Sequence, residues 1–577
     1  IVDGAVQAAK ALPHDIALVG PKTLIYQLLP RLFGNTNTTR QPNGTIEENG
    51  CGKFNDINDA ALERIASMGF THVWYTGIIR HASATNYPFI TRRANANVVK
   101  GKAGSPYAIC DYYDVDPDLA VDVDHRMNEF KNLIERTHKH KLKVIIDFVP
   151  NHVARNYHSD VRPAPQIGGS DDQTVAFSPM NNFYYMPGKQ FISPVNDLDE
   201  PYHESPAKAS GNDAFTPAPS PFDWYETIKL NYGIDYQNGK ARHFSPQPDT
   251  WYKMRDILHY WADTGIDGFR VDMAEMVPVE FWNWCIAQIT MRHPQIIFIA
   301  ETYDLSQYRN YIRAGFNYLY DKVNFYDTIR AVLTEQKHAN EIGDIWRRTD
   351  GINQQMLYFL ENHDEQRLAS DFFLGSNNLN KAKPALALTL LMGKGAAMIY
   401  FGQEIGERGM DSEGFSRVDG RTTIFDYWGI ERVQQMVGDH TYDGATLPDE
   451  AKQLQNWYTT ICQLVHNHEA LSTGEMYDLM WNQPIYVDAT KIYAFLRYNE
   501  KERYIIVCNF SDKKISTQLR ITDDAWRLMG ATWNECIVPF NVISRRSLIA
   551  SRSSIDIIKE KGLPIEVDAH DVLIAKI

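Results

Sequence analysis

The chain has 577 residues, a formal net charge of −14 and a hydrophobic fraction of 44%. It is too long for one domain of usual size, so we expect two or three domains. The acidic balance disfavours a nucleic-acid partner, because phosphate binding needs a basic face, and no apolar run approaches the roughly 20 residues that span a bilayer. The 6 cysteines lie far apart without zinc-like spacing, which indicates incidental thiols rather than a disulfide framework.

Strand-like and helical patterns alternate from about residue 20 to about residue 465. The predicted strands lie at residues 24–29, 71–75, 143–146, 268–272, 297–300, 316–320, 357–360 and 396–400. Helical spacing of apolar residues separates several of them, at residues 60–68, 125–140 and 251–264. This alternation predicts a parallel sheet. Eight strands over this length, with no glycine-rich nucleotide loop after the first, favour a closed (β/α)8 barrel over an open sheet.

One long segment interrupts the alternation after the third predicted strand. Residues 154–236 are rich in Pro, Gly, Asn, Ser and Asp, as in Pro217-Ala218-Pro219-Ser220-Pro221. A loop of this length within a compact domain is usually functional. We therefore expect an inserted subdomain here, which divides the barrel into residues 1–153 and 237–471.

The pattern changes again after Leu471, where apolar residues recur with period two. Residues 491–497 and 504–509 are strand-like and are separated by polar turns. The tail, residues 472–577, is therefore predicted to form an antiparallel β-domain, of sandwich type, at the C-terminus.

Acidic residues stand at the ends of four predicted strands, in the order Asp147, Asp272, Glu301 and Glu361 with Asp364. Because a parallel barrel gathers the C-terminal ends of its strands at one face, we expect these acids to share one site. Arg270 and Asp272 share a strand face, and we expect the guanidinium to keep Asp272 ionised, as a nucleophile requires. The four residues before Glu301 are apolar, and a partly apolar pocket suits a proton donor.

The remaining polar residues of these motifs suit a sugar substrate. Asp364 adds a negative charge that would stabilise a positively charged sugar ring, and His152 and His363 would hydrogen-bond ring hydroxyls. Two carboxyls roughly 5 Å apart would carry out a retaining double displacement. Taken singly, an Arg-x-Asp on a strand is more often an ion pair, and an Asn-His-Asp is more often a turn. Their combination at successive strand ends favours a catalytic site.

With these motifs the chain resembles the α-amylase family, glycoside hydrolase family 13, from about Ile25 to its end. The motifs are Asp147-Phe148-Val149-Pro150-Asn151-His152, Gly268-Phe269-Arg270-Val271-Asp272, Ile299-Ala300-Glu301, Glu361-Asn362-His363-Asp364 and Gly402-Gln403-Glu404. The resemblance implies a (β/α)8 barrel, a B subdomain after the third strand and a C-terminal β-domain. It also implies that Asp272 is the nucleophile, Glu301 the general acid/base and Asp364 the acid that stabilises the transition state.

The resemblance assigns roles to further residues. Arg270 would be the partner of the nucleophile, Asp147 a structural acid, and His152 and His363 would line the sugar subsite, with Tyr107 stacked under the sugar. Four other aromatic residues are candidate sugar platforms: Trp74, Trp224, Tyr225 and, in the loop after Glu301, Tyr303.

The resemblance also raises the question of a metal. Asn151 falls on a calcium ligand of the family, so a Ca²⁺ site is expected there. Glu275 and Met276 stand where the family often has Lys-His, which weakens the calcium case and leaves acceptor specificity open. Ile228-Lys229-Leu230-Asn231 resembles the fifth-region motif of neopullulanases and cyclomaltodextrinases.

These residues predict a retaining hydrolase of α-1,4-glucans, with starch-type glucans or maltooligosaccharides as substrates. Two alternatives stay open: a glucanotransferase that uses the same intermediate, and a catalytically silent glucan-binding protein, which would usually lack one of the carboxylates. The chain begins at Ile1 without a visible signal peptide. We expect a secreted or periplasmic protein, because enzymes that degrade polymers tend to be exported. The sequence leaves the oligomeric state open.

Overall fold

The computed structural model describes residues 21–196 and 200–577. Eight parallel strands close into a barrel in the order β1-β16-β15-β14-β13-β12-β5-β2. Their bounds are Leu24–Leu28 (β1), His72–Tyr75 (β2), Lys143–Phe148 (β5), Gly268–Val271 (β12), Ile297–Ala300 (β13), Tyr318–Tyr320 (β14), Met356–Tyr358 (β15) and Ala396–Tyr400 (β16). The predicted (β/α)8 barrel is confirmed, and each predicted strand overlaps one of these eight. Residues 1–20 of the first predicted barrel part lie outside the described residues.

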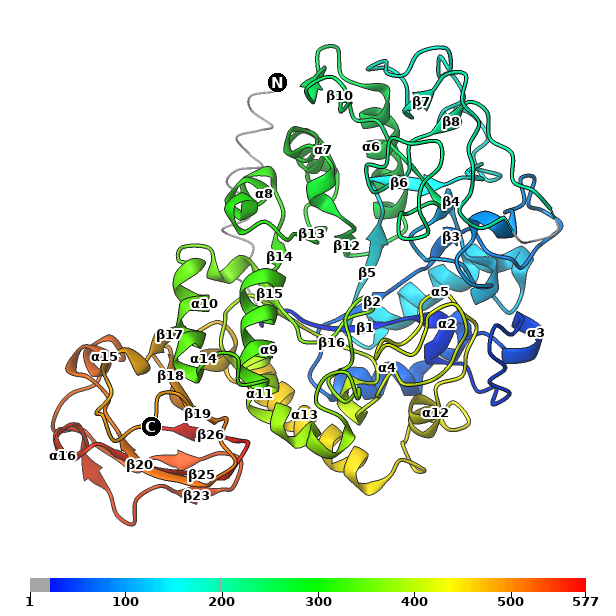
Figure 1. Ribbon diagram of the computed structural model, residues 1–577. Coiled ribbons are helices and arrows are strands. Elements are labelled where there is room, and N and C mark those ends of the chain that lie inside the picture. The colour runs from blue at the N-terminus through cyan, green and yellow to red at the C-terminus, as the bar shows by residue number, and fades with distance from the viewer. Residues whose placement is uncertain (1–20, 197–199) are drawn as a thin grey trace.

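Helices surround the barrel, as Figure 1 shows. The main ones are Asp59–Ser67 (α4), Arg126–Lys139 (α5), Asp249–Ala262 (α6), Val279–Arg292 (α7), Tyr308–Ala314 (α8), Asp327–Leu333 (α9), Ile342–Arg348 (α10), Lys383–Leu391 (α11) and Asp449–Asn467 (α13). Both faces of a parallel barrel strand are buried, which explains why the strands read as continuous apolar runs.

The inside of the barrel is a separate cluster of buried side chains. It includes Ile25, Trp74, Ile145, Ile299, Tyr320, Leu357 and Met398, which come from seven of the eight strands. On β12 the outward residues Phe269 and Val271 belong to the main core. Because side chains alternate along a strand, Gly268 and Arg270 point inward, and Arg270 lies beside Asp147 of β5 in the strand register.

An irregular stretch follows β5 and lies on one side of the barrel (Figure 1). Its short strands are His152–Ala154 (β6), Tyr185–Met186 (β7), Ala207–Lys208 (β8), Thr227–Lys229 (β9), Ile234–Asp235 (β10) and Ala241–Arg242 (β11). They form the two-stranded antiparallel sheets β6-β9, β7-β8 and β10-β11. The stretch corresponds to the insertion expected at residues 154–236, of which 197–199 lie outside the described residues, and it continues through β11.

A second insertion, an antiparallel hairpin that was not predicted from the sequence, follows β2. Strands β3 (Ile79–His81) and β4 (Ile109–Val115) pair antiparallel, and a long loop that carries Tyr107 joins them. This loop lacks any regular hydrophobic period, so only the fold reveals that it returns to the barrel.

The C-terminal part contains a six-stranded sheet in the order β17-β18-β19-β26-β22-β23, whose neighbours pair antiparallel. The strands are Glu475–Asp478 (β17), Ile492–Tyr498 (β18), Arg503–Asn509 (β19), Phe540–Asn541 (β22), Arg546–Ser547 (β23) and Asp571–Lys576 (β26). The predicted antiparallel C-terminal region is confirmed. Two short helices, Asp523–Leu528 (α15) and Ile555–Lys561 (α16), interrupt it, and the period-two pattern gave no sign of them.

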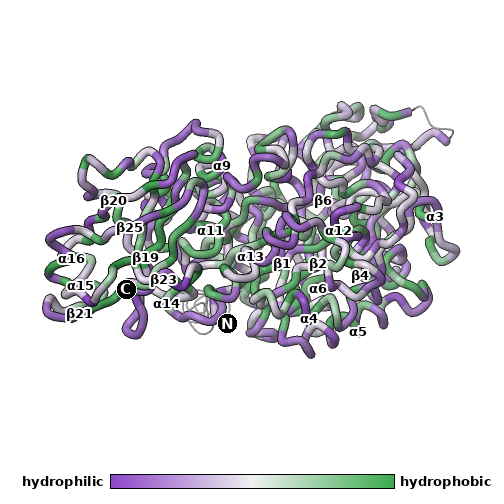
Figure 2. The backbone as a smooth tube through the Cα atoms, turned by 90° about the horizontal axis from the view of Figure 1, so that it is seen from below, coloured by the Kyte–Doolittle hydropathy of each residue, from purple (hydrophilic) through white to green (hydrophobic). Residues whose placement is uncertain are grey.

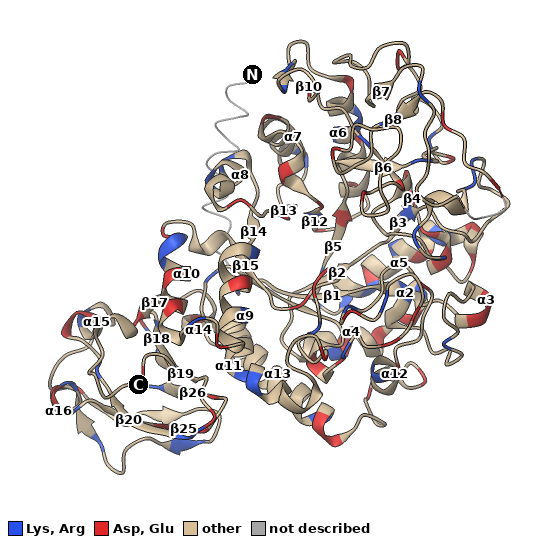
Figure 3. Ribbon diagram, in the orientation of Figure 1, with Lys and Arg blue, Asp and Glu red and all other residues tan. Residues whose placement is uncertain are grey.

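Hydropathy and charge follow this architecture. In Figure 2 green apolar stretches run through the interior of both parts, while many peripheral loops are purple. Figure 3 shows acidic and basic residues interspersed along the ribbon. Within residues 21–196 and 200–577, no helix combines the length and the apolar character needed to cross a membrane.

Candidate active site

Arg270 lies at the centre of a carboxylate cluster at the C-terminal ends of β5, β12 and β13. Its Nη1 is 3.0 Å from Asp272 Oδ1 and 3.3 Å from Asp147 Oδ1, and its Nη2 is 3.0 Å from Glu301 Oε2. The Arg270 side chain is only 1% exposed. One buried guanidinium therefore holds three carboxylates, and the four side chains carry a net negative charge when all three acids are ionised.

The backbone turns sharply directly after Asp272, and this turn connects Asp272 to Glu301 through a hydrogen bond. The Asp272 N–H donates to the Phe148 carbonyl over 2.9 Å, which extends the sheet one residue beyond β12. Met273 then adopts a left-handed conformation with φ 45°, which is uncommon for a residue other than glycine. This turn aims the Met273 N–H at Glu301 Oε2, 2.8 Å away.

Glu301 lies among polar groups. Besides Arg270 and the Met273 N–H, the Tyr303 hydroxyl donates a hydrogen bond of 2.6 Å to Glu301 Oε1. The partly apolar pocket expected from Ile297 to Ala300 is therefore not what surrounds the carboxyl, because those four residues form β13 and pack into the two cores.

Asp364 joins the cluster through a ring pair. The His363 ring stacks on Tyr107, with centroids 5.2 Å apart. His363 Nε2 lies 2.8 Å from the Tyr107 hydroxyl and 3.1 Å from Asp364 Oδ2. The Tyr107 hydroxyl also donates to Asp147 Oδ1 over 3.1 Å. The predicted Asp364, His363 and Tyr107 thus meet the other acids at one end of the barrel.

Gln27 on β1 was missed by the sequence analysis. Its amide nitrogen lies 2.9 Å from His363 Nδ1 and 3.0 Å from Thr76 Oγ1. A polar side chain near the C-terminal end of the apolar run Leu24–Leu28 was the signal that could have revealed it.

Asp272 and Asp364 have pKa values that are shifted in opposite directions. Burial raises the pKa of Asp272 well above its usual value, the charges of Glu301, Asp364 and Asp147 raise it further, and Arg270 only partly opposes them. The expectation that Arg270 keeps Asp272 ionised is therefore not supported, because burial and the neighbouring acids outweigh the guanidinium and the pKa shift is upward. At Asp364 desolvation acts upward, but the charge and hydrogen bond of His363 outweigh it, with help from Arg270, and lower the pKa to about 2.

His152 begins β6, four residues after the end of β5. Burial lowers its pKa to about 3, with a smaller contribution from Lys229, so the ring is neutral near pH 7. Its Nδ1 lies 3.1 Å from the amide nitrogen of Asn151, and its ring meets Trp224 edge-on at 5.3 Å.

The other aromatic candidates occupy different environments. Trp74 is 1% exposed inside the barrel, and its indole N–H donates to Asp147 Oδ2 over 2.9 Å. Tyr225 is 3% exposed, and the Lys100 ammonium lies 5.3 Å from its ring centroid. Both rings pack in the interior, whereas Trp224 and Tyr303 keep part of their surface open.

The side chains around Asn151 do not fit the expected calcium ion. Asn151 Oδ1 accepts a hydrogen bond from the Lys229 ammonium over 2.5 Å, so a positive charge already occupies the direction in which a metal would bind. Across the described residues, no group of three or more His, Cys, Asp or Glu side chains could hold a metal ion.

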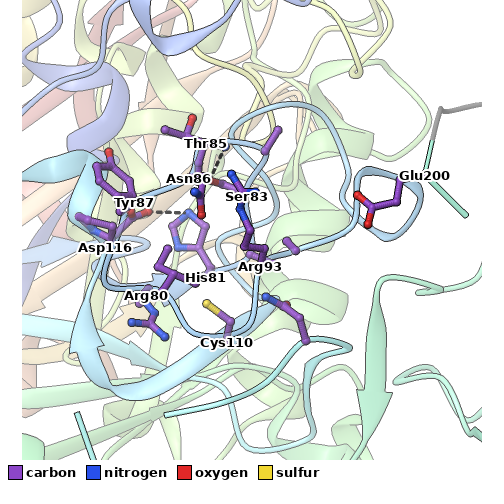
Figure 4. Close-up of a pocket in the computed structure, with 16 residues that line it drawn as sticks. Arg80, His81, Ser83, Thr85, Asn86, Tyr87, Arg93, Cys110, Asp116 and Glu200 are labelled. Carbon is purple, nitrogen blue, oxygen red and sulfur yellow. Dashed lines mark hydrogen bonds and ion pairs between the residues drawn. The ribbon is translucent and has the colours of Figure 1, made fainter. Parts of the chain in front are cut away.

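A separate pocket is lined mainly by strand β3, the first part of the loop that joins β3 to β4, and residues next to β4 (Figure 4). Two of its charged side chains, His81 and Arg80, are paired with acids. His81 Nε2 lies 2.9 Å from Asp116 Oδ2, as the dashed line in Figure 4 shows, and Arg80 forms ion pairs with Asp111 and Asp114. None of the described residues that line it is a sequence-predicted site residue, so the carboxylate cluster remains the candidate site.

The family profile described as "Alpha amylase, catalytic domain" matches residues 27–455. The Cyclomaltodextrin glucanotransferase of Bacillus sp. (strain 1011) is 26% identical over 406 residues, which cover 66% of this chain and 49% of that protein. Alpha-amylase 3 of Dictyoglomus thermophilum is 24% identical over 429 residues, which cover 70% of this chain and 74% of that protein. The chain thus spans about half of the first relative's length.

Solved structures share the fold. A noncanonic maltogenic α-amylase, AmyB, from Thermotoga neapolitana superposes with a TM-score of 0.61 at 20% identity, covering 96% of this chain and 98% of that one. The α-amylase of Geobacillus thermoleovorans, solved with acarbose, has the same TM-score of 0.61 at 18% identity and the same coverage of 96% and 98%.

Proposed function

Because this chain belongs to the α-amylase family, we propose that it is a retaining glycoside hydrolase that cleaves α-1,4-glucosidic bonds in starch-type glucans or maltooligosaccharides. The observation that carries the proposal is that Arg270 forms ion pairs with both Asp272 and Glu301, each 3.0 Å from one of its two terminal nitrogens. Two carboxyls that contact the same guanidinium lie close together, and retaining glycosidases use a closely spaced pair, about 5–5.5 Å apart.

In this mechanism Asp272 attacks the anomeric carbon while Glu301 protonates the departing glycosidic oxygen. The bond to the leaving sugar breaks and a glycosyl ester of Asp272 forms. Esterification removes the charge of Asp272, so Glu301 no longer faces a second negative charge beside Arg270. Glu301 can then take a proton from the water that hydrolyses the ester, which returns both carboxyls to their starting states.

Asp364 has a different task. Its low pKa keeps it ionised throughout the cycle, and its side chain is 44% exposed, unlike the buried acids. An ionised carboxylate at this place would stabilise the positive charge that develops on the sugar ring in the transition state. His363, fixed by Gln27 and Tyr107, holds the carboxylate in position.

The relatives support this class of substrate, since those reported above are named α-amylases or cyclomaltodextrin glucanotransferases. The second name also supports transfer of the glycosyl group to a sugar acceptor in place of water. Both reactions pass through the same ester on Asp272, and they differ only in the acceptor. Because enzymes that degrade polymers such as starch tend to be exported, we further propose that the enzyme acts outside the cytoplasm, as a secreted or periplasmic protein.

The decisive experiment is digestion of maltoheptaose, followed by proton NMR of the first product. Release of the α-anomer would establish retention, and the β-anomer would refute the proposed displacement. Amylose, pullulan and cyclodextrins digested in parallel would define the substrate, and products longer than the starting oligosaccharide would indicate transfer. Tight binding of maltoheptaose without cleavage, for native protein and Asp272→Asn alike, would favour the silent glucan-binding alternative.

A further inference from the structure

Lys229 is a buried cation that joins the inserted stretch to the barrel. Its side chain is 2% exposed, and its Nζ lies 2.5 Å from Asn151 Oδ1 and 2.8 Å from Asp213 Oδ1. The face of the Tyr236 ring lies 5.1 Å from the ammonium. A buried ammonium is costly unless it is paired, so two oxygens and an aromatic face around one lysine indicate a position built for a positive charge.

The partners of Lys229 come from different parts of the fold. Asn151 follows β5 of the barrel, and Lys229 ends β9, opposite His152 of β6. Asp213 lies in the turn between the bridged residues 210 and 214 and has a left-handed φ of 62°. Because this backbone conformation is unfavourable for a residue other than glycine, the turn is held by its contacts, among which is the carboxylate–ammonium pair.

The cation sets the orientation of the Asn151 side chain, which contacts His152. An ammonium can only donate hydrogen bonds, so the oxygen of the Asn151 amide must face Lys229. The amide nitrogen then faces the Gly211 carbonyl at 2.8 Å and His152 Nδ1 at 3.1 Å. A donor at Nδ1 leaves the proton of the neutral ring on Nε2. The charge on Lys229 therefore determines the tautomer of His152.

The same place cannot also hold a calcium ion. Calcium takes six to eight oxygen ligands at about 2.3–2.6 Å, whereas the Asn151 oxygen is engaged by Lys229, and a divalent ion beside it would meet the ammonium. Burial lowers the pKa of Lys229, and Asp213 opposes this by its charge and hydrogen bond.

We propose that the Lys229 ammonium acts as a built-in structural cation that replaces calcium at the junction between the barrel and its inserted stretch, and that it positions His152 through Asn151. Lys229 is thus a positioning residue. The junction needs no metal, and its order depends on the charge of one side chain.

The first test concerns metal on the unaltered protein and needs no substrate. Thermal unfolding is followed in EDTA and in millimolar CaCl₂, and bound calcium is measured after dialysis. We expect the same midpoint in both buffers and no calcium bound at this junction. A midpoint that falls in EDTA, recovers with CaCl₂ and loses this response in Asn151→Ala would overturn the proposal. Neither readout uses a glucan, so failure of the proposed activity would leave this test intact.

The second test removes the charge. Lys229→Met keeps the length of the side chain, and we expect a lower midpoint and limited proteolysis of residues 154–242 faster by about tenfold. The control is Lys208→Met on β8, a lysine 4.0 Å from Glu204 within the same inserted stretch, which should behave like the unaltered protein. Equal midpoints and cleavage rates for Lys229→Met and the unaltered protein would overturn the proposal.

The third test separates positioning from general stability. Lys229→Arg retains the charge, so we expect it to recover most of the kcat that Lys229→Met loses, with a smaller change in KM. Recovery of the midpoint without recovery of kcat would show that His152 does not depend on the cation. If Lys229→Met does not fold, the arginine variant and the metal measurement still decide the proposal.

Discussion

The Tyr303 hydroxyl donates a 2.6 Å hydrogen bond to Glu301, two residues earlier in the same loop. Tyr303 was expected as a sugar platform, but its hydroxyl is committed to the carboxyl proposed as acid and base. A second contact stabilises this loop, because Glu275 Oε1 accepts the Asp304 N–H over 2.8 Å. Glu275, at the position where the family often has lysine, thus stabilises the loop that orients Glu301.

We predict that Tyr303→Phe lowers kcat/KM on maltoheptaose by about 10-fold, because leaving a buried hydrogen-bonding group without its partner costs about 1–3 kcal/mol. Steady-state kinetics would show whether the loss lies in kcat, as expected for misorientation of Glu301, or in KM, as expected for a sugar platform. The matched control is Tyr308→Phe, whose hydroxyl donates to Asp321 outside the cluster. That variant should keep the kcat of the folded enzyme.

Asp272→Asn is expected to abolish turnover and to stabilise the fold at neutral pH. The pKa of Asp272 is raised in the folded protein, so ionisation of this carboxyl costs folding free energy above its unfolded pKa of about 3.9. That cost is present at pH 7 and fades as the pH falls through the raised pKa. The asparagine variant should therefore unfold at a higher temperature at pH 7, and the difference should shrink towards pH 4.

Calorimetry at several pH values would check this, with the exposed Asp124→Asn as the control. Activity of the Asp272→Asn variant should fall by at least about 10³-fold. A variant that is both active and less stable at pH 7 would contradict both the assignment and the electrostatic argument.

Asp364 should show the opposite dependence on pH. Its pKa of about 2 lies below that of an unfolded aspartate, so its ionised form stabilises the fold above about pH 4, and this contribution is lost as the pH falls from about 4 to about 2. We predict that Asp364→Asn unfolds at a lower temperature than the unaltered protein at pH 7, by a modest amount because the side chain is 44% exposed. If the difference in unfolding temperature between Asp364→Asn and the unaltered protein stays constant down to pH 3, the ionisation of Asp364 is not its cause.

Gly211 is predicted to tolerate no side chain. A Cβ there would lie 2.5 Å from Thr227 Oγ1 and 2.9 Å from His152 Cβ, and such overpacking typically costs about 1–3 kcal/mol. Gly211→Ala should lower the unfolding temperature and raise KM by displacing His152. Gly169→Ala, where the nearest atom would be 3.3 Å away, is the control for the same exchange within the inserted stretch. Identical KM values for both variants would exclude a link between Gly211 and the substrate site.

Much of the barrel could be predicted because its strands bury both faces and therefore appear as short apolar runs. The observed strand boundaries differ from the predicted ones where a side chain forms a hydrogen bond with the backbone of the neighbouring strand. The sixth strand begins at Tyr318 rather than residue 316. At Asn317 the side-chain oxygen accepts the Phe298 N–H over 2.8 Å, while the Asn317 N–H donates to the Phe298 carbonyl over 2.9 Å. The β3–β4 hairpin and helices α15 and α16 escaped prediction because their segments lack a sustained period.

The sequence by itself determined which acids lie at one end of the barrel, because strand-end positions follow from the alternation of apolar and polar residues along the chain. Only the tertiary structure decided how those acids ionise and what supports them. Gln27 meets His363 across 336 residues of sequence, and Lys229 meets Asn151 across 78. Burial and charge–charge distances arise from such long-range contacts, and no local pattern of residue types encodes them.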